Sequence, residues 1–204
     1  VLRARLADAR FFYDEDRKIP LGDRVEKLKT IVFQEGLGTM YDKAQRLKKL
    51  SAVIAARIGI SPVDMPAVER GAELAKADLV TGMVCEFTEL QGVMGREYAL
   101  LSGESQVAAD TVFEHYLPRF AGDILPRTLA GRAVAIADKL DNIITTFSRG
   151  LIPTGSQDPY ALRRQAIGIV NILIDGKIFL NLSTIAAEAM QLAGIVDREK
   201  QQQL

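Results

Sequence analysis

Two adjacent arginines, Arg163 and Arg164, follow a polar segment at 153–159 that begins and ends with proline. We expect Asp158 to cap a helix that begins at Pro159, because a carboxylate accepts N–H bonds there and proline has no N–H to leave unpaired. Held on such a stiff frame, the two guanidinium groups could bind phosphates of an RNA backbone. They could equally pair with carboxylates, such as that of Asp158 or those of an adjoining domain.

A second set of basic side chains lies along one predicted helix and consists of Lys43, Arg46, Lys48, Lys49 and Arg57. Such a helix could follow the acceptor stem of an RNA, because A-form RNA is recognised mainly through its phosphates and its shape. The alternative is an ordinary solvated helix face. The RNA-binding residues that we predict are Arg163 and Arg164 first, then Lys48, Lys49 and Arg46.

The composition of the chain restricts where such contacts can lie. Its 26 basic and 26 acidic side chains give a net charge of zero, unlike the basic excess of a stand-alone nucleic-acid-binding domain. Any contact with RNA must therefore be local. No run approaches the roughly 18 uninterrupted apolar residues of a membrane span, so we expect a soluble protein with no membrane partner.

The single cysteine, Cys85, rules out an internal disulfide and offers no zinc-ligand spacing, as is typical of proteins in a reducing cytoplasm. We expect Cys85 to be a small core residue. The first residue is valine, and no leader segment precedes the first predicted helix. These features favour a piece of a longer cytoplasmic chain.

Apolar residues recur at helical spacing along nearly the whole chain, with no period-two strand and no hairpin turn, which predicts an all-α bundle. The expected helices lie at 2–13, 25–32, 39–59, 66–85, 104–117, 127–149, 162–173 and 182–194, with a turn-rich segment after 85 and a frayed polar end at 201–203. Thr39 and Asp42 should form a capping box. The helix at 127–149 has the clearest apolar stripe and should be central. We divide the chain into a helical domain at 1–150 and a helical extension at 151–204.

Five further segments, together with the polar loop and its arginines, resemble the β subunit of bacterial glycyl-tRNA synthetase of the two-subunit α/β type. They read VLRARLADARFFY at 1–13, VFQEGLGT at 32–39, FTELQGVMGR at 87–96, HYLPRFAGD at 115–123 and ADKLD at 137–141. The family's β chain is several times longer, so this chain resembles a central fragment. The resemblance implies that the α subunit activates glycine with ATP and Mg, whereas the β subunit contributes tRNA binding and assembly. It implies tRNA(Gly), the α subunit and the rest of the β chain as partners, and no cofactor in this fragment.

Three segments also resemble the HD phosphohydrolase superfamily, a helical fold named after a metal-binding His-Asp pair. They read LAKADL at 74–79, VFEHY at 112–116 and RAVAIADKLD at 132–141, and Ala77 stands where that family has its histidine. The resemblance implies an HD-domain-like bundle and leaves Asp78, His115 and Asp138 as candidate metal ligands. We expect any such metal site to be vestigial, because alanine cannot replace the missing imidazole. The alternative is a polar pocket in which the aspartates bond to backbone groups or arginines.

We therefore predict a non-catalytic module of glycine–tRNA ligase that binds the acceptor region of tRNA and positions it for the α subunit. A metal-dependent phosphohydrolase of the HD type and a structural scaffold for subunit assembly are the alternatives. The sequence shows no nucleotide-binding motif that would compete with the first function, because the glycines of GVMG at 92–95 lack the lysine of a P-loop.

Overall fold

The computed structural model describes residues 2–155 and 157–195, so the polar end expected at 201–203 lies outside the described residues. These residues form α-helices and short 3-10 helices without a β-strand, which confirms the all-α class. The α-helices are α1 (Leu2–Asp16), α2 (Met40–Arg57), α3 (Met65–Leu74), α4 (Gly82–Glu86), α5 (Val93–Leu101), α6 (Gln106–Glu114), α7 (Leu129–Ser148), α8 (Leu162–Gly176) and α9 (Leu182–Leu192). The 3-10 helices are η1 (Leu21–Thr30), η2 (Ala77–Val80) and η3 (Thr88–Leu90).

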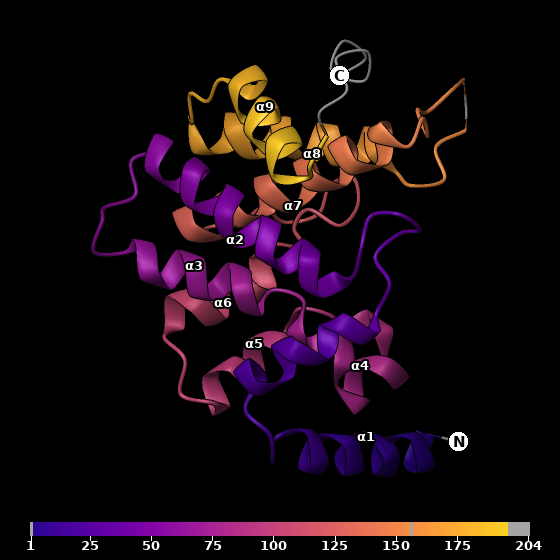
Figure 1. Ribbon diagram of the computed structural model, residues 1–204. Helices are drawn as coiled ribbons and strands as arrows, with labels where there is room; N and C mark the ends of the chain where they lie inside the picture. The colour runs from indigo at the N-terminus through magenta and orange to yellow at the C-terminus, as the bar shows by residue number, and fades with distance from the viewer. Residues whose placement is uncertain (1, 156, 196–204) are drawn as a thin grey trace.

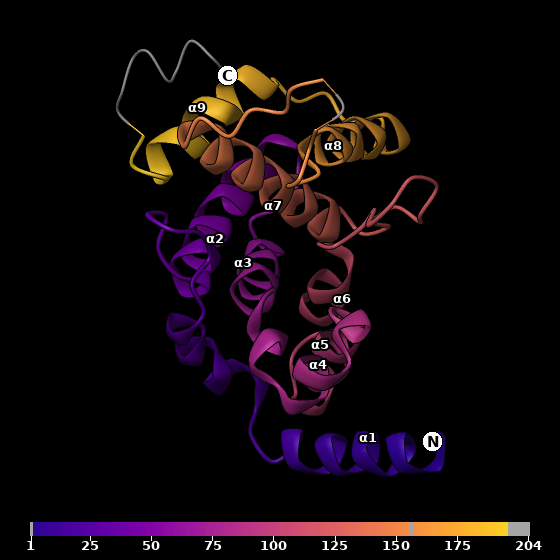
Figure 2. The same cartoon turned by 90° about the vertical axis from the view of Figure 1, so that its right-hand side faces the viewer.

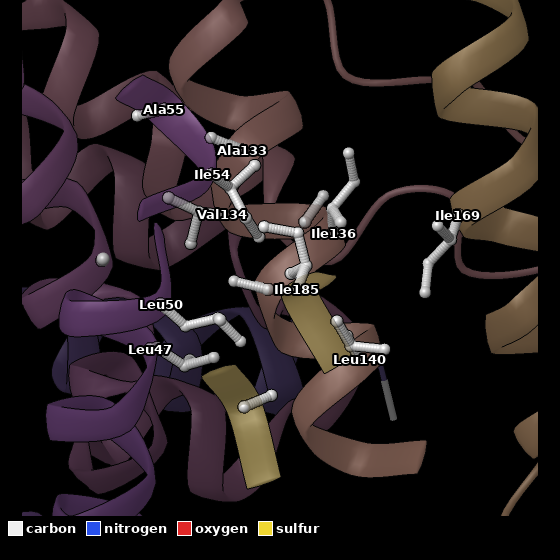
Figure 3. Packing of buried hydrophobic residues seen from close by; sticks show 14 of the residues in the cluster. Leu47, Leu50, Ile54, Ala55, Ala133, Val134, Ile136, Leu140, Ile169 and Ile185 are labelled. Carbon is white, nitrogen blue, oxygen red and sulfur yellow. The ribbon is translucent and has the colours of Figure 1, made fainter. Parts of the chain in front are cut away.

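The central position predicted for the helix at 127–149 is confirmed. α7 runs through the middle of the molecule, where it contacts α2, α3, α6, α8 and α9 (Figure 1). Every residue at 133–141 is buried, and the alanines among them let neighbouring helices approach α7 closely. In the larger core cluster α7 meets Leu50 and Ile54 of α2 and Ile185 of α9 (Figure 3).

A second core cluster joins η1, α3, α5 and α6 around Leu21, Leu74, Tyr98 and Val112. Because α3 contributes to both clusters, they belong to one packed molecule. α1 lies at one end of it beside α4, and α8 and α9 cover the opposite end (Figures 1 and 2). The extension after 150 therefore packs on the preceding helices, whereas a domain boundary at that point stays a prediction.

The continuous helix predicted at 66–85 is wrong. The chain leaves helical geometry after α3, forms η2, and starts α4 behind Thr81, whose hydroxyl accepts a hydrogen bond from Val84 N at 3.3 Å. The cause is tertiary: Lys76 Nζ donates to Asp138 at 3.2 Å, and Asp78 accepts from Gly92 N at 2.7 Å. These contacts with distant segments override the helical propensity of the local sequence.

Other elements also differ from the predictions. The helix expected at 25–32 is the 3-10 helix η1, the turn-rich segment after 85 contains α5, and the helix expected at 104–117 ends at Glu114. Gly95 weakens the helical signal of α5, but a Cβ at this position would come within 2.7 Å of Val112 Cγ1, so the glycine permits close packing of α5 on α6. Cys85 is exposed, because α4 turns Met83 and Val84 to the core instead.

The start of α8 confirms one prediction and corrects another. Asp158 does cap this helix, since its carboxylate accepts from Leu162 N at 2.8 Å and from Arg163 N at 2.9 Å. The helix begins at Leu162, however, and not at Pro159. Ala161 has a left-handed φ of 53° and turns the chain into the helix. Within the described residues, no helix is both long and apolar enough to cross a membrane.

Candidate functional site

A polar cavity of about 300 Å³ lies where α7, the start of α8 and the segment after α6 meet. Its lining consists of Lys76, Tyr116, Pro118, Arg119, Asp138, Lys139, Asn142, Tyr160, Ala161, Arg164 and Gln165. Four of these side chains are basic, and Asp138 carries the single carboxylate of the lining. Such a cavity is suited to an anion, because converging positive charge in a partly dry site attracts one.

A larger cavity of about 590 Å³ lies between α1 and α5 and is mainly apolar. Its charged members are already paired: Arg96 with Asp110 at 2.6 Å, Arg10 with Asp14 at 3.8 Å, and Glu97 with the hydroxyl of Tyr13 at 3.0 Å. Size alone would favour this cavity as a ligand site. The polar cavity is the better candidate for chemistry, because its buried charges are unevenly paired.

Asp138 lies at the centre of the buried charges. Lys43 Nζ lies 3.1 Å from Oδ1, without the geometry of a hydrogen bond, and Lys76 Nζ donates to Oδ2 at 3.2 Å. Burial would raise the pKa of Asp138, but the charges of Lys43 and Lys76 lower it well below its usual range. The carboxylate is therefore ionised and serves as an anchor for ammonium groups.

Asp141, one turn further along α7, completes this anchor. Lys43 Nζ donates to its carboxylate at 2.9 Å, and Arg46 donates to it at 2.7 and 3.1 Å. Asn142 accepts another bond from Lys43 at 2.8 Å. The carboxylates at 138 and 141 therefore act as a pair that binds Lys43 and Arg46 of α2 together with Lys76.

Lys139 is the least compensated charge in the cavity. Its side chain is buried, and its Nζ donates to the carbonyl oxygens of Leu117 at 2.7 Å and His115 at 3.5 Å. In residues 2–155 and 157–195, no carboxylate lies within ion-pair distance of it. Burial lowers the pKa of Lys139 to about 8, although the charge of Asp138 opposes this shift. An anion entering the cavity would find this ammonium group without a carboxylate partner.

The candidate metal ligands have other partners. His115 Nδ1 donates to the Val112 carbonyl at 2.7 Å, and burial together with the charge of Lys76 keeps the ring neutral by lowering its pKa well below the usual value. Asp78 accepts from Gly92 N, and burial raises its pKa to about 6. The described part of the chain contains no group of three or more His, Cys, Asp or Glu side chains placed to hold a metal ion. Lysines surround Asp138 instead, so the geometry does not support phosphohydrolysis at Asp78, His115 and Asp138.

Arg163 and Arg164, at the start of α8, lie in different surroundings. Both are exposed. Arg163 Nη1 donates to the Gly155 carbonyl at 2.6 Å, which ties this side chain to the loop. Arg164 lines the cavity together with Lys76 and Lys139. Neither guanidinium has a carboxylate within ion-pair distance among the described residues, and their role in RNA binding stays a prediction.

The basic run on α2 does not form one solvated face. Lys43 is buried, and Arg46 is bound to Asp141 with its side chain only 12% exposed. Lys48 lies 3.4 Å from Glu73, whereas Lys49 is exposed. The spacing that suggested an RNA-binding stripe instead directs Lys43 and Arg46 toward the carboxylates of α7. RNA contacts by Arg46, Lys48 and Lys49 stay a prediction.

Sequence reasoning missed the part that Lys76 and Lys139 play in the site. The sequence contained a signal for Lys139. This lysine lies inside an alanine-rich run that is expected to be buried, and a buried lysine is rare unless it is paired. The partners could not be identified, since Lys76 and Asp138 are 62 positions apart.

Comparison with known proteins identifies the family of the chain. The family model of the glycyl-tRNA synthetase beta subunit matches residues 1–204. The glycine–tRNA ligase beta subunit of Clostridioides difficile (strain 630) is 56% identical over 202 residues, which are 99% of this chain and 29% of that protein. That of Halothermothrix orenii is 57% identical over 185 residues, 91% of this chain and 27% of that protein. The chain thus spans less than a third of the length of these relatives. It belongs to the glycyl-tRNA synthetase β-subunit family.

Proposed function

We propose that this chain is a non-catalytic module of glycine–tRNA ligase that binds the acceptor region of tRNA(Gly) and positions it for glycylation by the α subunit. Membership of the β-subunit family supports the assignment to this ligase. The observation that carries the RNA-binding role is the exposed pair Arg163 and Arg164, with Arg164 on a cavity whose lining has four basic side chains and one carboxylate. Arginine forks and lysines bind RNA phosphates through charge-assisted hydrogen bonds.

Such a module contributes by positioning. Contacts with phosphates fix the orientation of the RNA and thereby convert a rare encounter of its 3′ end with the activated amino acid into a frequent one. In this proposal the α subunit uses ATP and Mg, and this chain holds no cofactor. We also propose a cytoplasmic location, to which the exposed free thiol of Cys85 is suited because thiols stay reduced there.

Binding of the chain to a minihelix with the acceptor-stem sequence of tRNA(Gly) tests the proposal. Fluorescence anisotropy is measured over a series of salt concentrations. We expect the affinity to fall steeply with salt, since each phosphate contact releases counterions. Arg163→Glu/Arg164→Glu should weaken binding at least about tenfold, because charge-assisted hydrogen bonds are lost and the charge is reversed.

A matched control reverses Arg3 and Arg10, which are exposed on α1 at the opposite end of the molecule (Figure 2). This control changes the net charge by the same amount and should leave the affinity within about twofold, because exposed charges beyond a Debye length of roughly 10 Å are screened. If both double variants weakened RNA binding equally, the loss would be due to the change in overall charge and not to Arg163 and Arg164. Absence of binding at low salt would overturn the RNA-binding role.

A scaffold for assembly is the second candidate, favoured by an apolar stripe on α8. Ile167, Val170 and Ile174 are 60%, 46% and 71% exposed, and Phe179 beyond the helix is 97% exposed. Positions 167, 170 and 174 share one helix face, and exposed apolar patches are typical of interaction surfaces. If the scaffold role is the correct one, Ile174→Glu/Phe179→Glu weakens subunit assembly, and the arginine reversals leave the RNA affinity unchanged.

A further inference from the structure

The polar cavity contains more positive charge than its neighbouring carboxylates neutralise. Lys76 shares Asp138 with Lys43 at 3.2 and 3.1 Å, and Arg119 is bound to Asp123 at 2.9 Å. Lys139 and Arg164 line the same cavity, and the ion pairs of the described residues include neither of them. Two cations thus face one space without a carboxylate of their own.

The aromatic ring of Tyr116 forms part of the cavity wall beside Lys76. The hydroxyl of Tyr116 is buried, and no acceptor bonds to it within the described part of the chain. Its ring lies beneath Lys76 Nζ, 4.2 Å from the ring centroid, which fixes the orientation of the tyrosine. Burial raises the pKa of Tyr116 well above the usual value, so the hydroxyl keeps its proton. Because water does not reach this hydroxyl, Lys139 and Arg164 are the groups of the cavity wall that an anion would bind.

The size and charge of the cavity restrict the class of anion. A volume of about 300 Å³ is at the lower end of the range for small-molecule sites. A phosphate within a strand is flanked by sugars on both sides and stays at the surface, whereas a terminal phosphate can enter a pocket from one side. A phosphomonoester carries a charge of about −1.5 to −2 at neutral pH and three acceptor oxygens, which suit two cations.

We propose that this cavity binds a phosphomonoester, with Lys139 and Arg164 as ion-pair partners. Two sources share this chemistry: the 5′-terminal phosphate of an RNA, and a free phosphate or mononucleotide. The RNA source rests on the proposed function, while binding of free phosphate does not. Asp138 acts as a positioning residue that holds Lys76 at the cavity wall.

Two RNA hairpins of one sequence, with a 5′-phosphate or a 5′-hydroxyl and a dye in the loop, test the RNA source by anisotropy. Titration calorimetry with inorganic phosphate tests the free source. We expect saturable phosphate binding and, if RNA is the source, at least about tenfold tighter binding of the 5′-phosphorylated hairpin. Arg164→Gln should abolish the phosphate binding and, if RNA is the source, the discrimination between the two hairpins.

Arg163→Gln is the matched control, because Arg163 is exposed and adjacent but bonds to the Gly155 carbonyl instead of lining the cavity. Thermal unfolding of each variant verifies that the fold is preserved. Binding of phosphate without binding of either hairpin would support the phosphate site and overturn the RNA-binding role. Equal, salt-dependent binding of both hairpins together with no binding of phosphate would overturn the pocket and leave the RNA role standing.

Discussion

Lys43 shows how this protein tolerates a buried cation. Its ammonium contacts Asp138 at 3.1 Å and Asp141 at 2.9 Å while its side chain is 2% exposed. Burial lowers the pKa of Lys43, but the charges of Asp138 and Asp141 outweigh that effect and raise it. The lysine therefore stays charged, and both carboxylates depend on it.

Replacement of this lysine by an apolar side chain of similar length should destabilise the fold strongly. Lys43→Met leaves buried carboxylates with too few cations, which costs about 3–5 kcal/mol of unfolding free energy. Lys49→Met, at an exposed position of the same helix, should change it by less than about 0.5 kcal/mol. Urea unfolding measures both, and similar values for the two variants would contradict the role assigned to the buried charges.

Asp78 should make stability depend on pH. Burial raises its pKa to about 6, compared with about 3.9 in an unfolded chain. The folded state therefore binds this proton more tightly, and the unfolding free energy decreases as the pH rises from about 4 to above 6. The expected loss is about 2–3 kcal/mol. Asp78→Asn, whose amide oxygen can still accept from Gly92 N, should remove this contribution. If urea unfolding shows the same dependence of the unfolding free energy on pH in this variant, the dependence belongs to other groups.

At the scale of elements, α2 follows from local sequence alone. Thr39 Oγ1 accepts from Asp42 N at 3.2 Å, and Asp42 Oδ2 accepts from Thr39 N at 2.8 Å, which confirms the predicted capping box. Thr39→Ala should lower the unfolding free energy by about 1 kcal/mol. Thr30→Ala, which removes an exposed hydroxyl bonded to the Lys27 carbonyl, should cost less. Equal losses in thermal or urea unfolding would show that the box adds nothing.

The helices that sequence periodicity predicted well are those whose boundaries have local causes. α2 has its cap, α7 has its long apolar stripe, and α9 is capped by Asn181, whose side chain accepts from Thr184 N at 3.1 Å. The break between α3 and α4 was not predictable in this way, because Lys76 and Asp78 are held by Asp138 and Gly92.

The prediction of the site was limited in the same way, because its residues come together through contacts between distant segments. Arg164 and Asp138 were recognised as candidates, and the structure places both on one cavity. Lys139 joins them only because α7 packs beside α8, and Lys43 was expected on a solvated face because periodicity does not reveal which face meets carboxylates.

At the scale of the whole molecule, the net charge is zero, but the basic side chains fall into a buried group and an exposed group. The carboxylates of α7 hold Lys43, Lys76 and Arg46 inside the bundle. Arg163 and Arg164 stand outside it at the start of α8, at the end of the molecule opposite α1 (Figure 1). The RNA site that we propose therefore needs no basic excess in the chain.

The most direct test of a positioning role separates the two steps of glycylation in the assembled enzyme that carries Arg163→Glu/Arg164→Glu in this chain. Exchange of pyrophosphate into ATP reports glycine activation, and charging of tRNA(Gly) reports the transfer step. We expect unchanged exchange and a kcat/KM for tRNA lowered at least about tenfold, since only interactions with RNA are lost. An equal fall in both activities, or no fall in charging, would contradict it.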